Sequence, residues 1–122
     1  MIEFLQELTK QFRLVVPESY HERNRKETVL YPYVTFDFDS EALEENTEGF
    51  YIDVDIFDNQ ASYTDIFQIE DALKNHFKDN RQLTDDIYLR FRFLRSTKIP
   101  TGDDLIKRRN LQFYCKTDWR TM

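Results

Sequence analysis

Two short stretches of the chain alternate carboxylates with large apolar side chains. The first, YVTFDFD at residues 33–39, contains Asp37 and Asp39, and the second, YIDVDIFD at residues 51–58, contains Asp53 and Asp55. Side chains two residues apart on a β-strand point to the same face, so these acids could share one surface. Several carboxylate oxygens on one surface can hold Mg²⁺, an arrangement that supports metal-assisted phosphodiester cleavage. A metal-dependent nuclease is therefore one hypothesis for this protein.

A second feature bears on the same hypothesis. The pair Asp58-Asn59, followed by Asp71-Ala72-Leu73, is similar to the Asp-Asn and Asp-Ala-Leu motifs of phage Holliday-junction resolvases of the RusA type. However, no lysine directly follows Asp58-Asn59, and no later acidic pair lies in an equivalent setting. The acids are better interpreted as surface or interface groups, and we expect no metal site.

Residues for other kinds of catalysis are scarce in the sequence. A single cysteine, Cys115, excludes an intramolecular disulfide, and the two histidines, His21 and His76, show no zinc-site spacing. With only two glycines, the chain contains no phosphate-binding glycine-rich loop and no G-x-S-x-G nucleophile motif. The sequence therefore predicts no catalytic residues, no cofactor and no enzymatic activity.

Composition narrows the class of protein further. The 122 residues fit a single domain, residues 1–122, and a hydrophobic content of 40% is enough for a core. A net charge of −6 disfavours general binding to nucleic acid or to anionic membranes. The N-terminus carries acids instead of the basic start of a signal peptide, and no apolar run reaches the roughly 20 residues that span a bilayer. We expect a soluble, cytoplasmic protein.

The periodicity of apolar residues predicts the elements that position the charged residues. Spacing typical of a helix covers residues 1–16, through Ile2, Leu5, Leu8 or Thr9, Phe12 and Val15, and again about residues 62–80, through Ile66, Ile69, Leu73 and Phe77. Alternation predicts strands at residues 31–39, 50–57, 87–95 and 105–118, with a possible short strand near 19–23. The long acidic connection at residues 40–49 predicts a protruding, mobile hairpin tip.

The predicted fold class is therefore α+β. Its order is α-β-β-α-β-β, with an antiparallel sheet made from two hairpins and packed with two helices.

The two predicted hairpins carry opposite charges. Outward positions of the first are acidic, whereas the second contains Arg90, Arg92, Lys107, Arg108 and Arg109. If the hairpins meet within one sheet, these residues form charge ladders on its outer face, with about 0.2–1 kcal/mol per pair. If they lie at opposite ends of the molecule, the acidic edge of one subunit can face the basic edge of the next. Such a head-to-tail contact can close into a ring.

The ordered segments YPYVTFDF, GFYIDVDIFDN, IEDALKNHF, FRFLRS and PTGDDLIKRRNLQFYCK resemble the tail terminator or tail-completion (head–tail joining) proteins of long-tailed bacteriophages and prophages. The most specific parts are residues 51–77 and 103–109, the latter containing Asp103 and Asp104. The resemblance covers nearly the whole chain. It rests on the order and spacing of the segments rather than on a catalytic motif.

The resemblance implies an α+β protein that assembles as a ring, commonly a hexamer, on the end of the tail tube. It implies the tube protein and the head connector as partners, assembly in the bacterial cytoplasm, and a final place at the head–tail junction of the virion. By this analogy, the segments at residues 41–48 and 97–104 contact neighbouring subunits or the tube. Neither a membrane nor a specific nucleic-acid sequence is an expected partner. An unrelated adaptor domain remains the third hypothesis.

Overall fold

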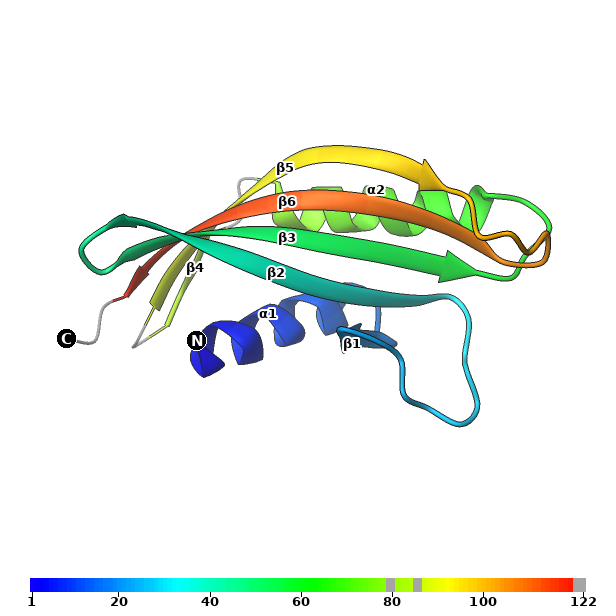
Figure 1. Cartoon of the computed structure of the whole chain (residues 1–122), viewed down its shortest axis with the longest axis horizontal. Coiled ribbons are helices and arrows are strands. Elements are labelled where there is room, and N and C mark those ends of the chain that lie inside the picture. Colours follow the sequence, from blue (N-terminus) through cyan, green and yellow to red (C-terminus); the bar gives the residue numbers. More distant parts are fainter. Residues whose placement is uncertain (79–80, 85–86, 120–122) are drawn as a thin grey trace.

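The computed structural model describes residues 1–78, 81–84 and 87–119 and has two helices on one side of a six-stranded sheet (Figure 1). In chain order the elements are α1 (Ile2–Val15), β1 (Ser19–His21), β2 (Tyr33–Glu44), β3 (Thr47–Asp58), α2 (Thr64–Phe77), β4 (Arg81–Leu83), β5 (Ile87–Ile99) and β6 (Lys107–Trp119). The strands lie in the order β1-β2-β3-β6-β5-β4. The α+β class and the order of the main elements are therefore as predicted.

The sheet is mixed, so the prediction of a wholly antiparallel sheet is wrong at one edge. Strand β1, which was predicted as a possible short strand, runs parallel to β2 and pairs Ser19 with Val34 through His21 with Phe36. Alternating apolar residues indicate a strand, but they carry no information about its direction. Strand β4 was not predicted, because its three residues, RQL, are too few to show a period.

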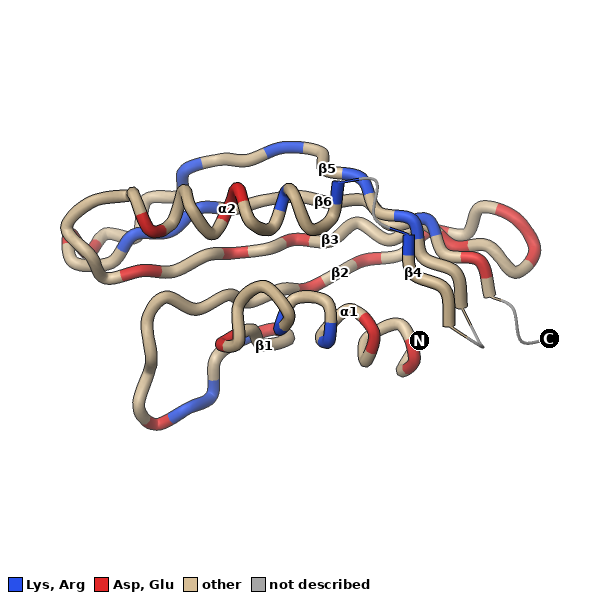
Figure 2. Tube along the Cα trace, turned by 180° about the vertical axis from the view of Figure 1, so that it is seen from behind, with Lys and Arg blue, Asp and Glu red and all other residues tan. Residues whose placement is uncertain are grey.

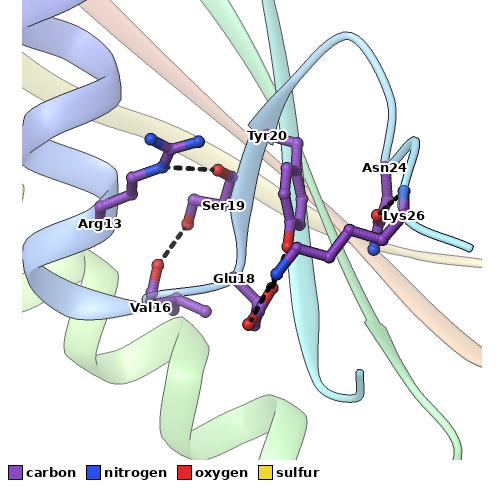
Figure 3. A network of polar contacts seen from close by, with 7 residues as sticks. All are labelled: Arg13, Val16, Glu18, Ser19, Tyr20, Asn24 and Lys26. Carbon is purple, nitrogen blue, oxygen red and sulfur yellow. Dashed lines mark hydrogen bonds and ion pairs between the residues drawn. The ribbon is translucent and has the colours of Figure 1, made fainter. Parts of the chain in front are cut away.

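A hydrogen-bonded network attaches β1 to the end of α1 (Figure 3). The Ser19 hydroxyl donates to the Val16 carbonyl at 2.7 Å, and Arg13 Nε donates to the Ser19 carbonyl at 3.1 Å. Glu18 accepts a hydrogen bond from the Tyr20 hydroxyl and pairs with Lys26 Nζ at 3.0 Å. These contacts hold β1 over the first part of β2 only.

The two hairpins join through β3 and β6, which pair antiparallel from Thr47 opposite Asp118 to Asp58 opposite Lys107. The hairpins therefore meet within one sheet, which is the first of the two arrangements that the sequence left open. On the helix side, the predicted inward residues of β3 are all buried: Phe50, Ile52, Val54 and Ile56. Alternation along β3 thus identified its buried face correctly.

The predicted buried face of helix α1 is correct at Leu8 and Phe12 and wrong at Ile2, and the prediction omitted Phe4. Phe4, Leu8 and Phe12 are fully buried, whereas Ile2 is 69% exposed. The Phe4 ring stacks on Phe50 with 3.8 Å between centroids. Aromatic rings bury the largest apolar areas, so Phe4 and Phe12 determine the orientation of the helix more strongly than Ile2 does.

Helix α2 packs as predicted through Ile66, Leu73 and Phe77, while Ile69 is only partly buried. It ends at Phe77, and the predicted end near Asn80 lies outside the described residues. In the described part of the chain, none of the helices is long and apolar enough to cross a membrane.

Both long hairpins extend further than predicted. Strands β2 and β3 continue to a two-residue turn, Glu45-Asn46, in place of the long connection expected at residues 40–49. Asn46 has φ 65°, a left-handed conformation that asparagine tolerates in tight hairpin turns. The resulting tip projects past the helices (Figure 1). Likewise, β5 continues to Ile99, across a segment predicted as loop, after a register shift between Phe93 and Arg95.

Gly49 in β3 provides space for an aromatic ring of β6. A Cβ atom at position 49 would lie 1.8 Å from Tyr114 Oη, so alanine there must displace the ring. We expect Gly49→Ala to lower the free energy of unfolding by about 1–2 kcal/mol, as is typical of overpacking. Urea denaturation measures the cost in the wild type and in a Tyr114→Ala background, where it should vanish. An equal cost in both backgrounds would show that the ring is not the obstacle.

Candidate functional site: the helix-free face of the sheet

The side of the sheet opposite the helices carries most of the charged residues that the sequence singled out. We call it the open face. Acids lie on β2 and β3 and cations lie mainly on β5 and β6, so charge changes sign from one half of the sheet to the other (Figure 2). The acidic half contains Asp37, Asp39, Asp53 and Asp55, and the basic half contains Arg90, Arg92, Arg95, Arg108 and Lys116. Strand alternation, confirmed by the buried residues between them, places these side chains together.

Where the halves meet, acids of β3 accept hydrogen bonds from side chains of β6. Asp55 Oδ1 accepts a hydrogen bond from Arg108 Nε at 2.9 Å and from Asn110 Nδ2 at 3.3 Å. Asp53 Oδ1 accepts one from Gln112 Nε2 at 3.0 Å. Of these contacts, the Asp55–Arg108 pair is a rung of the charge ladder that the one-sheet arrangement predicted, whereas Asn110 and Gln112 are uncharged partners.

The four acids are dispersed instead of converging on a point. Asp37 lies directly opposite Asp53 in the β2–β3 ladder, and its Oδ1 is 3.4 Å from His21 Nε2. Asp39, two residues further, is exposed. Among the residues that the structure describes, no group of three or more His, Cys, Asp or Glu side chains could hold a metal ion. Burial raises the pKa of Cys115 to about 12, so its thiol is protonated at neutral pH.

Arg90 and Arg92, the two arginines of β5 that the sequence singled out, make different contacts within the subunit. Arg90 Nη2 lies 2.6 Å from Asp118 Oδ2, so this cation has an acidic partner within the subunit. Arg92 is exposed and lies over the Tyr114 ring at 5.8 Å. Of the two, Arg92 is the better candidate for a contact with another molecule.

Lys107, Arg108 and Arg109 were predicted as one basic run, but β6 divides them between its two faces. Arg108 lies on the open face, where it also covers the Phe57 ring at 5.4 Å. Lys107 lies over the ring of Tyr63 at 5.5 Å, on the helix side. Arg109 points toward α2 and so belongs to a different cluster.

That cluster is centred on Glu70, which was not predicted from the sequence. Glu70 is only 6% exposed, and it accepts hydrogen bonds from Ser96 Oγ and, at 2.8 Å, from Arg109 Nε. Its other oxygen pairs with Lys74 Nζ at 2.9 Å. Burial alone would raise the pKa of Glu70, but these hydrogen bonds lower it below its usual value. One feature of the sequence could have indicated it. Glu70 lies four residues after Ile66 and therefore falls on the apolar face of the predicted helix, where an acid needs a partner.

Asp103 and Asp104 lie apart from the open face, in the loop between β5 and β6. Asp103 Oδ1 accepts a hydrogen bond from the Leu105 amide at 2.9 Å, and its carbonyl accepts one from the Ile106 amide at 3.1 Å. Asp104 is exposed. Asp103 therefore shapes a loop that presents Leu105, whose side chain is 74% exposed.

The protein is similar to a known protein in its fold but not in its sequence. No protein-family model matches the sequence, and no curated protein matches it. Among solved structures, the fold is similar to a chain described as "Virion of native gene transfer agent (GTA) particle", with a TM-score of 0.66 and 15% sequence identity. The match covers 88% of this chain and 84% of that one. The two chains share a fold over most of their lengths.

Because the acids are dispersed and partly paired, we expect the protein not to bind divalent metal tightly. Isothermal titration with Mn²⁺ should give no saturable heat in the micromolar range. Saturable binding that disappears when Asp53→Asn is combined with Asp55→Asn would contradict this and would restore the nuclease hypothesis.

The Glu70 cluster should make stability depend on pH. Glu70→Gln removes the charge that faces Arg109 and Lys74, and we expect a loss of about 2 kcal/mol near pH 7. The folded pKa is lowered, so the stabilisation is present above the unfolded value of about 4.3 and is lost as pH falls through the folded pKa. Urea denaturation should show the two proteins converging in acid. Asp71→Asn, an exposed acid on the same helix, serves as the control, and a gap that persists at low pH would contradict the assignment.

Proposed function

We propose that this protein is a structural component of a phage-like particle and that it assembles with copies of itself into a ring at the end of the tail tube. In that position it stops tube growth, joins the tail to the head, or does both. In this role the protein performs no catalytic step and needs no cofactor. Its partners are further copies of this chain, the tube protein and the head connector.

The observation that carries the proposal is the extent of the structural match. A gene transfer agent is a phage-like particle, and the shared fold extends over 88% of this chain and 84% of the virion chain. The segment order that resembles tail terminators and head–tail joining proteins supports the more specific role. By the same resemblance, the protein would assemble in the bacterial cytoplasm and remain at the head–tail junction of the particle.

The open face gives the proposal a physical basis. A subunit with an acidic half and a basic half attracts a second copy most strongly when unlike halves meet. That contact is heterologous, and repeated contacts of this kind close into a ring when the rotation between subunits permits it.

The test is the oligomeric state of the purified protein. We expect native mass spectrometry over a dilution series at moderate salt to show one closed oligomer, and electron microscopy of the same sample to show rings with a central opening. Raising the salt concentration should weaken the assembly, because part of the contact is electrostatic. A protein that is monomeric at every concentration and is not captured by tail tubes would contradict the proposal.

A further inference from the structure

The sheet has two long edges that are only partly covered. Strand β1 pairs with β2 at residues 34–36, and β4 pairs with β5 at residues 88–90. Within residues 1–78, 81–84 and 87–119, no strand pairs with the outer edge of β2 at residues 38–44 or of β5 at residues 91–99. We call these segments the β2 edge and the β5 edge. Unpaired strand edges present backbone N–H and C=O groups that can pair with another chain.

The two edges carry opposite charges on the open face. Asp39 and Glu41 lie along the β2 edge, and Arg92 and Arg95 lie along the β5 edge. All four residues are exposed. Uncovered edges with like charge would repel each other, whereas these two are complementary and would place acids opposite arginines.

Backbone geometry makes the edges compatible as well. In β2, the Val34 amide donates to the Glu18 carbonyl, and the Phe36 carbonyl accepts from the Glu22 amide. These even-numbered residues therefore turn their peptide groups away from β3. By alternation, Phe38, Ser40 and Ala42 do the same further along. Their side chains belong to the helix side of the sheet.

The β5 edge shows the same relation between peptide groups and side chains. Ile87 C=O accepts from the Thr84 amide, so Ile87 and, by alternation, Phe91 and Phe93 turn their peptide groups away from β6. The side chains of Ile87 and Phe91 are buried under the helices. If the β2 edge of a second copy is added here, the sheet continues from one subunit into the next. The helices of both subunits then lie on one side of it, and the charged residues lie on the other.

The directions of the strands agree with such an addition. Strands β2, β3, β6 and β5 are antiparallel to their neighbours in turn. When one subunit follows another in the same orientation, β5 of the first is antiparallel to β2 of the second. This orientation is the one that a cyclic ring requires.

A hollow beside the β5 edge offers space for apolar side chains of the incoming strand. It has a volume of about 400 Å³ and is lined by Lys74, Asn75, Lys78, Phe91, Arg92 and Phe93. It lies between α2 and the uncovered part of β5. The β2 edge carries Phe38 and Ala42 on the corresponding side, and Phe38 is only partly buried within its own subunit.

We propose that the β2 edge of one copy pairs, antiparallel, with the β5 edge of the next copy, so that neighbouring subunits share a continuous sheet. Acids of the incoming strand lie beside Arg92 and Arg95, and its apolar side chains cover the hollow next to α2. This contact rests on the proposed ring and specifies its interface. The partner that fits the β5 edge is thus a second copy of this chain.

The experiment blocks one edge at a time and then mixes the two variants. Ser40→Pro removes an outward N–H of the β2 edge without removing a hydrogen bond to β3. Arg92→Glu combined with Arg95→Glu reverses the charge of the β5 edge. Matched controls in the loop between β1 and β2 are Thr28→Pro and the double variant Arg23→Glu with Arg25→Glu.

Native mass spectrometry at a concentration where the wild type and controls form oligomers should show each edge variant alone as a monomer. An equimolar mixture should give a one-to-one dimer and nothing larger, because only one compatible pair of edges remains. Thermal unfolding verifies that each variant is folded. If Ser40→Pro is unfolded, Ala42→Pro, which removes another outward N–H of the same edge, replaces it.

The outcomes separate this inference from the proposed function. An edge variant that alone assembles like the wild type, or a mixture that gives no dimer, overturns the edge pairing while the ring itself stands. Wild-type protein that stays monomeric at every concentration and on tail tubes overturns both.

Discussion

The pairing of β3 with β6 is the interaction on which the rest of the structure depends. A single two-stranded hairpin is marginally stable in water, and this chain contains two of them, separated by a helix. The ladder from Thr47–Asp118 to Asp58–Lys107 joins them into four long strands with one face to bury. That face is large enough to accommodate both helices, with Phe50 of β3 under Phe4 of α1 and Phe113 of β6 beside Phe77 of α2. The same pairing brings the acidic and basic hairpins together.

As a consequence, the charge on the open face changes from negative at β2 to positive at β5. Pairs such as Asp55 with Arg108 neutralise the centre, whereas Asp39 on one side and Arg92 on the other remain exposed. Exposed ion pairs stabilise a protein only weakly, so this pattern contributes little to folding. In the proposed ring its stronger effect is on association, where complementary potentials select the partner and the register. The charge pattern of the open face therefore favours the proposed assembly more than it favours stability.

The sequence predicted those parts of the fold in which apolar residues alternate without interruption. Phe50 through Ile56 identified β3 and its buried face, and Ile66, Leu73 and Phe77 identified α2. Elements built from polar residues were missed, because pairing with a neighbouring strand, rather than burial, keeps them extended. The last part of β2, beyond Ser40, is such a case. The parallel direction of β1 depends on tertiary contacts, which local periodicity does not encode.

The positions of the candidate site residues were also predicted only in part. Strand alternation correctly placed Asp53 and Asp55 on the outer face, but it also divides Lys107, Arg108 and Arg109, which adjacent positions had suggested as a group. Glu70 was missed because its partners, Ser96 and Arg109, come from strands distant in sequence. The uncovered edges depend on the lengths of β1 and β4, and three-residue strands leave almost no signal in a sequence.

Hydrogen exchange of the wild-type protein tests the central claim, shared sheet edges in a ring, most directly. Amides that are unpaired in the monomer exchange rapidly and become protected when another strand pairs with them. Mass spectrometry of peptides from dilute and assembled protein should show new protection at residues 38–44 and 91–99, with little change in α1. Protection confined to the helices or to the loop at residues 100–106, with both edges still exchanging rapidly in the assembly, would contradict the account.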